Sequence, residues 1–126
     1  MSETQEAVRT TQEIADRLVQ LCREGKYEEV QNELFSDDAE SIEPPGAPGL
    51  QSVKGLDQIK KKGEDFNNMV EEIHSGSVSE PVVAGRFISL AMLLDATFKG
   101  MGRQKIEEIC VYETKDGKIV KEQFFF

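Results

Sequence analysis

Apolar residues recur at helical spacing through the first half of the chain and alternate with polar residues in much of the second half. Three amphipathic segments predict helices at residues 6–24, 26–35 and 56–74. Gly25 follows the first segment and "SGS" follows the third, and both are typical of helix ends. The helices are therefore expected to lie mainly in the N-terminal half.

Strands separated by turn residues account for the rest of the chain. The expected strands are residues 39–43, 77–84 with an interruption at Pro81, 86–98, 104–114 and 118–126. Helices gathered before a run of antiparallel strands predict an α+β fold rather than an alternating α/β fold. We expect a single domain, residues 1–126, in which three helices pack on one face of a curved antiparallel sheet and leave a cone-shaped cavity.

The balance of charge argues against two classes of partner. The chain carries 24 acidic and 15 basic residues, which gives a formal net charge of −9. Nucleic acids and anionic membranes both bind basic surfaces, so we expect neither as a partner. The one dense basic run, Lys60–Lys62, is followed at once by Glu64 and Asp65, and we interpret it as a solvated helix face.

Location and cofactors follow from what the sequence lacks. No apolar stretch approaches the roughly 18 residues that cross a bilayer, and the N-terminus has no hydrophobic signal region, so we expect a cytoplasmic protein. Cys22 and Cys110 lie far apart within apolar patterns, as buried thiols do. Neither has a CxxC neighbour, and His74 is the only histidine, so we expect no metal site. No glycine-rich phosphate loop follows a strand, and we expect no cofactor.

Glu43 ends the first predicted strand and has two interpretations. It is either a solvated acid at a strand end, or a general base that points into the cone, where enclosure disfavours its charged form. Strand alternation puts Ser41 on the same face without saying which face is inside. The apolar walls expected around Glu43 come from the helices: Leu18, Phe66 and Val70. Residues that restrain the backbone follow it and predict a rigid loop: Pro44, Pro45, Gly46, Pro48 and Gly49.

Two other polar residues also have open interpretations. His74 falls at the end of the third predicted helix, where an imidazolium suits the helix dipole; alternatively it reaches the rim of the pocket as an acid or base. Asp95 interrupts the apolar strand 86–98. It either pairs with Arg86 or Arg103, or faces the pocket.

Aromatic residues on the last two strands fit a ligand cavity. Tyr112 either donates a hydrogen bond to a ligand or simply forms part of the wall. The chain ends in three phenylalanines, of which alternation should bury some, Phe124 among them. Strand 86–98 is largely apolar on both faces, so one face is expected to pack on the helices and the other on a second copy of the chain. This pattern predicts a homodimer through the sheet.

The order of elements and two stretches of sequence resemble the SnoaL-like proteins, within the larger group that contains nuclear transport factor two and ketosteroid isomerase. The stretches are "REGKYEEVQNELFSDDAESIEPPG" and "EEICVYETKDGKIVKEQFFF". The resemblance implies a cone-shaped, cystatin-like α+β barrel with an apolar pocket, and usually a homodimer. It does not imply one activity.

The resemblance also carries over to particular positions. In the isomerase branch the general base stands at the end of the first strand, and Glu43 occupies that place here. The place of that branch's oxyanion-binding tyrosine is held by Leu18, and its partner acid falls near Lys105. Without such donors an enolate loses a stabilisation often worth several kcal/mol.

Three functional classes follow, and the sequence favours the first. It is a small-molecule-binding pocket for an apolar ligand whose identity the sequence does not give. The alternative is an isomerase-, cyclase- or dehydratase-like enzyme that uses Glu43 as general base, assisted by His74 or Tyr112, on a small carbonyl or polyketide-like substrate. In the third class only the dimer surface is used.

Overall fold

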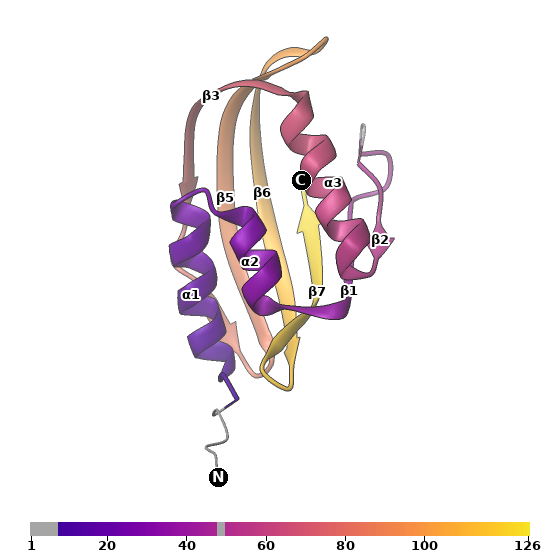
Figure 1. Ribbon diagram of the computed structural model, residues 1–126. Helices are drawn as coiled ribbons and strands as arrows, with labels where there is room; N and C mark the ends of the chain where they lie inside the picture. The colour runs from indigo at the N-terminus through magenta and orange to yellow at the C-terminus, as the bar shows by residue number, and fades with distance from the viewer. Residues whose placement is uncertain (1–7, 48–49) are drawn as a thin grey trace.

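Three helices lie on one face of a strongly curved sheet in the computed structural model, which describes residues 8–47 and 50–126 (Figure 1). The helices are α1 (Thr11–Arg23), α2 (Tyr27–Leu34) and α3 (Leu56–Met69). Residues 6–7 of the first predicted helix, and Pro48 and Gly49 of the predicted loop, lie outside the described residues. No helix in the described part of the chain is long and apolar enough to cross a membrane.

The first helix begins at Thr11, so the described residues 8–10 are not helical as the sequence pattern predicted, because Thr10 forms the N-cap. The Thr10 hydroxyl accepts a hydrogen bond from the Glu13 backbone N–H, and the Glu13 carboxylate accepts one from the Thr10 N–H. This reciprocal pair satisfies two donors that the helix itself leaves free. After Arg23 the chain reverses at Gly25, whose φ of 73° is left-handed and suits glycine. The turn places α2 beside α1.

The sheet has seven strands in the order β2-β1-β7-β6-β5-β3, with β4 also paired to β5. Their bounds are β1 (Phe35–Ile42), β2 (Val53–Lys54), β3 (Val70–Val78), β4 (Val82–Ala84), β5 (Phe87–Phe98), β6 (Gly102–Lys115) and β7 (Lys118–Phe125). Strands β5, β6 and β7 form the predicted antiparallel hairpins. The prediction of a wholly antiparallel sheet is wrong at one pair, because β1 runs parallel to β7. These two strands are far apart in sequence, so no hairpin turn sets their relative direction.

The third helix is shorter than its sequence pattern predicts. It ends at Met69, and Val70–Val78 forms β3 along the edge of β5. The backbone hydrogen bonds of this strand pair outweigh the local helical spacing of the apolar residues. His74 therefore lies on a strand and not at a helix end.

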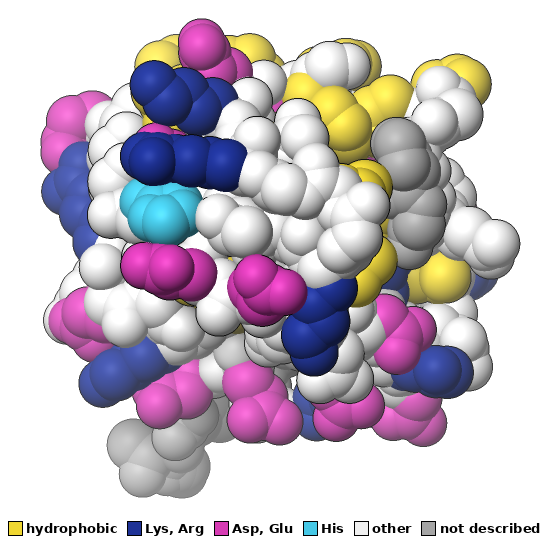
Figure 2. All heavy atoms as spheres, turned by 90° about the horizontal axis from the view of Figure 1, so that it is seen from above, with side chains coloured by type: hydrophobic (Ala, Val, Ile, Leu, Met, Phe, Trp, Pro, Cys, Tyr) yellow, Lys and Arg dark blue, Asp and Glu magenta, His cyan; other side chains and the backbone are white. Residues whose placement is uncertain are grey.

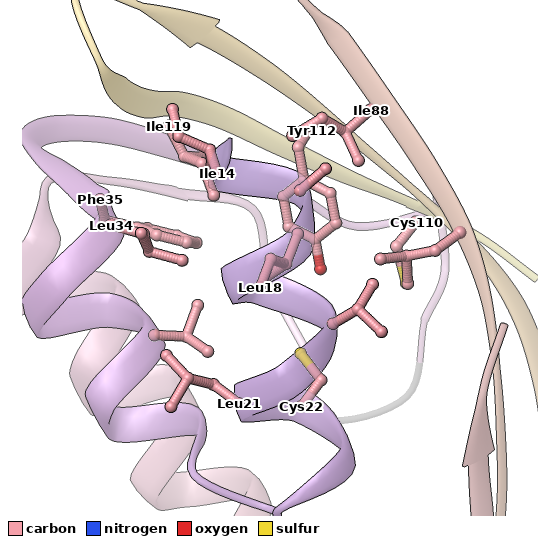
Figure 3. Packing of buried hydrophobic residues seen from close by; sticks show 14 of the residues in the cluster. Ile14, Leu18, Leu21, Cys22, Leu34, Phe35, Ile88, Cys110, Tyr112 and Ile119 are labelled. Atoms are coloured by element: carbon pink, nitrogen blue, oxygen red, sulfur yellow. The ribbon is translucent and has the colours of Figure 1, made fainter. Parts of the chain in front are cut away.

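The core fills the space between the helices and the inner face of the sheet. Even-numbered residues of β5 and β6 face inward, so the wholly apolar face of β5 covers the core as predicted. Ile14, Leu18 and Leu21 of α1 are fully buried in this core, in one cluster with Ile119, Tyr112 and Cys110 (Figure 3). Cys22 and Cys110 are buried free thiols, as expected, and burial raises the pKa of both, that of Cys22 to about 12.

Candidate functional site

A row of polar side chains crosses the inner face of the sheet. Glu122 of β7 pairs with Ser41 of β1 on one side and with Tyr112 of β6 on the other. Directly paired residues on one face have Cβ atoms about 5 Å apart. Ser41, Tyr112 and Glu122 are all buried. The face of the first strand that carries Ser41 and Glu43 is therefore the inner one.

Helix α3 brings a lysine to this row. Lys62 Nζ donates to the Glu43 carboxylate and to the Ser41 hydroxyl, each at 2.6 Å. The Lys62 and Glu43 side chains are only 12% and 6% exposed. The ammonium also lies 5.7 Å from the centre of the Phe124 ring, within the range of a cation–π contact.

The position of Lys62 corrects the interpretation of Lys60–Lys62 as a solvated face. Lys62 follows the buried Ile59 by three residues, and residues at that spacing share one face of a helix. Lys61 points outward and pairs with Asp65 on the surface. The run is thus divided between the two faces of α3.

The backbone around Glu43 is held on both sides. Its N–H donates to the Ser52 hydroxyl at 2.9 Å, and Pro44 restrains its conformation from the following position. The carboxylate consequently lies inside the cone and not in solvent. The five neighbouring polar residues on this part of the inner face, Ser41, Glu43, Lys62, Tyr112 and Glu122, are called the inner polar cluster below.

Glu122 of this cluster is buried, which disfavours the charged form of its carboxyl group. Burial raises its pKa to about 7; Ser41 and Lys62 oppose the shift, and the nearby Glu43 and Glu108 add to it. A carboxyl group with this pKa populates both its forms near neutral pH, which suits an acid or base.

Glu108 lies on the same inner face, two rows further along β6. Burial also raises its pKa, an effect that the Cys110 thiol partly opposes and the Glu43 charge reinforces. The thiol lies 3.5 Å from Glu108 Oε1. Within residues 8–47 and 50–126, no lysine or arginine forms an ion pair with Glu108.

Tyr112 places a polar atom in an otherwise apolar setting. The residue is 3% exposed, and its hydroxyl points from β6 toward the side of α1 that carries Leu18 and Cys22 (Figure 3). Burial raises its pKa well above the ordinary value. No described side chain or backbone group forms a hydrogen bond with this hydroxyl. An unpartnered buried hydroxyl costs about 1–3 kcal/mol, so a polar ligand atom here would be stabilising.

The helices do not cover the whole inner face. Beyond the Tyr112 row, inward-facing residues of β5, β6 and β7 remain only half-buried: Met92, Leu94, Ile106, Glu108 and Phe124. Two hollows of about 380 Å³ each also occur on the outside, one between α1 and Pro81 and one at the start of α3. Neither shares a residue with the inner polar cluster.

Two of the predicted site residues lie elsewhere, on the outer face of the sheet. Asp95 accepts both Arg103 hydrogen bonds at 2.9 and 2.8 Å, and this pairing lowers the pKa of Asp95. Asp95 thus forms the pair with Arg103 that one of its two interpretations describes, and it lies away from the inner polar cluster. His74 Nε2 lies 2.8 Å from Thr97 Oγ1, and Figure 2 shows the histidine on the surface between acidic and basic side chains. Odd-numbered positions of β5 point outward, Asp95 and Thr97 among them, and His74 of β3 contacts Thr97, so both predicted residues lie on the opposite face of the sheet from Glu43.

The predicted apolar residues divide between two ends of the cone. Leu18 and Phe124 belong to the core around the inner polar cluster. Phe66 instead contacts Phe98 edge to face, with ring centres 5.8 Å apart, and Val70 pairs with Phe98 across the sheet. Phe66 and Val70 thus line the end of the cone at the β5–β6 hairpin.

Sequence reasoning missed Lys62, Glu108 and Glu122. Part of the signal for Glu122 was present, since alternation puts Glu122 on the face of Phe124. A register shift between Glu113 and Thr114, which the "KDG" turn does not predict, then places Glu122 opposite Tyr112. Among the described residues, no three histidine, cysteine or acidic side chains converge closely enough to hold a metal ion.

The helix-covered, curved mixed sheet defines an α+β cone, the fold of NTF2-like and cystatin-like proteins. The chain belongs to the SnoaL-like domain family, whose sequence profile matches residues 9–126. A comparison with curated protein sequences gives no significant match.

Solved structures share this fold over nearly the whole chain. A Mesorhizobium loti protein, provisionally named a SnoaL-like polyketide cyclase, is 29% identical and has a TM-score of 0.87, with 94% of this chain and 100% of that chain covered. An NTF2-like protein of unknown function from Burkholderia pseudomallei is 14% identical, with a TM-score of 0.73 and coverage of 92% and 89%. A Bacillus subtilis protein, provisionally named an isomerase, is 19% identical, with a TM-score of 0.65 and coverage of 92% and 88%.

Proposed function

We propose that the chain is a small-molecule-binding protein whose ligand lies on the concave inner face of the sheet, against the inner polar cluster and Phe124. The observation that carries this proposal is the Tyr112 hydroxyl, which is buried and has no partner among the described residues. Native proteins seldom leave such a group unpaired unless it has another use. The half-buried apolar residues beside it, such as Met92, supply area for an apolar ligand body.

A direct test is a fragment screen followed by backbone amide NMR. Ligands should shift the amides of β6 and β7 near Tyr112 and Glu122 and leave the outer face unchanged. Tyr112→Phe should weaken the ligands that reach the hydroxyl, and Thr97→Val on the outer face serves as the control. Shifts confined to the outer hollows would overturn the proposal.

An enzyme that transfers protons is the second candidate, and the pKa of Glu122 near 7 favours it. Lys62 and Tyr112 would supply the hydrogen-bond donors for a developing oxyanion. They would replace the tyrosine and the acid of the isomerase branch, whose places here fall at Leu18 and near Lys105. Glu43 is held by Lys62, so it orients that lysine, and Glu122 is the better-placed acid or base. Two of the structurally similar proteins are provisionally named a polyketide cyclase and an isomerase. These names fit a small carbonyl or polyketide-like substrate.

Hydrogen–deuterium exchange at the α-carbon of small ketones separates the two candidates. Catalysed exchange that Glu122→Gln abolishes, while ligand binding persists, would favour the enzyme. Binding without exchange in the unaltered protein would favour the binding function alone.

The outer face of the sheet supports a homodimer as part of the same proposal. Ile109 lies between Ala91 and Phe125 across β5, β6 and β7, and Leu93 is close by. Leu93, Ile109 and Phe125 are 48%, 46% and 49% exposed. A contiguous apolar patch of this kind commonly marks an interface. The two free thiols support a cytoplasmic location as a further part of the proposal.

A further inference from the structure

We propose that the ligand carries a protonated amine, which binds beside the Glu108 carboxylate while its apolar body lies over Phe124 and Met92. This inference rests on the proposed binding function and specifies the chemical class of ligand for the same site. It follows from the excess of carboxylates over cations on the inner face, and from the order in which the side chains lie along β6 and β7.

The charges on the inner face do not balance. The Glu43 charge acts on both Glu108 and Glu122, and Glu108 acts on Glu122, whereas among the described residues Lys62 forms an ion pair with Glu43 alone. Lys62 is committed to Glu43 and Ser41 at 2.6 Å each. Among the residues that the structure describes, the Glu108 side chain has only the weak Cys110 thiol contact at 3.5 Å. An added cation near Glu108 would therefore be attracted and would not need to displace an existing partner.

The register of the strands gives the site an order from inside to outside. Tyr112 pairs with Glu122 in the innermost row, Cys110 pairs with Phe124 in the next, and Glu108 follows two residues further along β6. Successive rows on one face are about 7 Å apart. An aromatic and apolar row thus separates a buried row with hydrogen-bonding groups from a half-buried carboxylate.

This order matches an amphipathic amine. Its ammonium would form a charge-assisted hydrogen bond with Glu108, where the face is still partly open. Its apolar body would cover Phe124 and Met92, which are only half-buried. The buried, unpartnered Tyr112 hydroxyl would meet a polar atom at the other end of a longer ligand.

Three probes with the same apolar body and different end groups test the inference: 3-phenylpropylamine, 3-phenylpropan-1-ol and 3-phenylpropanoate. Dissociation constants are measured at pH 7.5 by amide NMR titration with the full chain. We expect the amine to bind at least about tenfold more tightly than the alcohol, which is the effect of one charge-assisted contact, and the carboxylate to bind most weakly. Equal affinity of amine and alcohol, or tighter binding of the carboxylate, would overturn the amine inference and leave the binding function standing.

Two variants locate the effect. Glu108→Gln should reduce the affinity for the amine to near that for the alcohol and leave the alcohol unchanged. Glu64→Gln removes the same charge from the exposed side of α3 and should leave both affinities unchanged. If Glu108→Gln keeps the preference for the amine, Glu108 is not its partner and the inference is wrong. If none of the three probes shifts the amides of β6 and β7, the result counts against the proposed binding function itself.

Discussion

Replacing Lys62 by methionine should destabilise the protein far more than the same change at Lys61. Lys62→Met removes the only cation that contacts the Glu43 carboxylate among the described residues, and that carboxylate is almost fully enclosed. Lys61→Met breaks a pair with Asp65 whose side chains are 68% and 56% exposed. The two lysines are neighbours on one helix, so helix propensity and net charge change equally.

The magnitude follows from the geometry of the pair. At 2.6 Å and an effective dielectric constant of about 20, the attraction between the two charges is roughly 6 kcal/mol. Desolvation of the two ions offsets part of it. Loss of one partner of a buried pair commonly destabilises by about 3–5 kcal/mol, and we expect about 3 because Ser41 remains beside Glu43. The exposed pair should contribute less than about 0.5 kcal/mol.

Urea unfolding at pH 7, followed by circular dichroism, measures both free energies of unfolding under one extrapolation. The double variant Lys62→Met/Glu43→Gln should recover a large part of the loss, because no uncompensated carboxylate is then buried. If Lys62→Met and Lys61→Met are equally stable, or if the double variant is the sum of its single changes, the pair is not the buried contact described here.

Three further predictions concern the other residues of the site and the outer face. Burial raises the pKa of Glu122 in the folded state from the ordinary value of 4.5 to about 7. The folded state therefore holds the Glu122 proton more tightly than the unfolded state, and the resulting stabilisation is lost as the pH rises from about 4.5 to about 7. Relative to the unaltered protein, Glu122→Gln should therefore gain up to about 3 kcal/mol in urea unfolding across that range; a difference that does not change with pH would contradict the assignment. Tyr112→Phe should be as stable as the unaltered protein or up to about 1 kcal/mol more stable in the same assay, whereas a loss larger than this would mean that the hydroxyl has a partner. Leu93→Asp should convert a dimer into a monomer of 14.1 kDa in light scattering, and an unchanged mass would place the interface elsewhere.

Local signals account for the parts of the fold that the sequence predicted well. The three hairpin-connected strands follow from alternation and from turns such as "KDG", which act over a few residues. The end of α3 was mispredicted because the segment from Val70 to His74 continues a helical pattern, while its strand partner β5 lies elsewhere in the sequence. The parallel pairing of β1 with β7 depends on a contact of the same long-range kind.

In the candidate site, too, local sequence signals were predictive and long-range contacts were not predicted. Glu43 was identified because the prolines that follow it and the alternation of its strand are local features. Its inward direction then depended only on which face of that strand the helices cover. Lys62 was missed because a run of three lysines resembles a solvated surface, and only the approach of β1 to α3 gives one of them a buried partner. Asp95 was left with two interpretations, and Arg103 decided between them from the neighbouring strand.

The physical contrast between Glu43 and Glu122 determines how the site can work. Glu43 is bound to a lysine at 2.6 Å, so its charge is compensated and its position is fixed. Glu122 is buried between Ser41 and Tyr112, it has no direct cationic contact within the described part of the chain, and burial raises its pKa to about 7. A fixed ion pair beside a carboxyl that titrates near neutral pH separates positioning from proton exchange. Substitution of Glu43 should therefore change where a ligand lies, whereas substitution of Glu122 should change which protonation state the site presents to it.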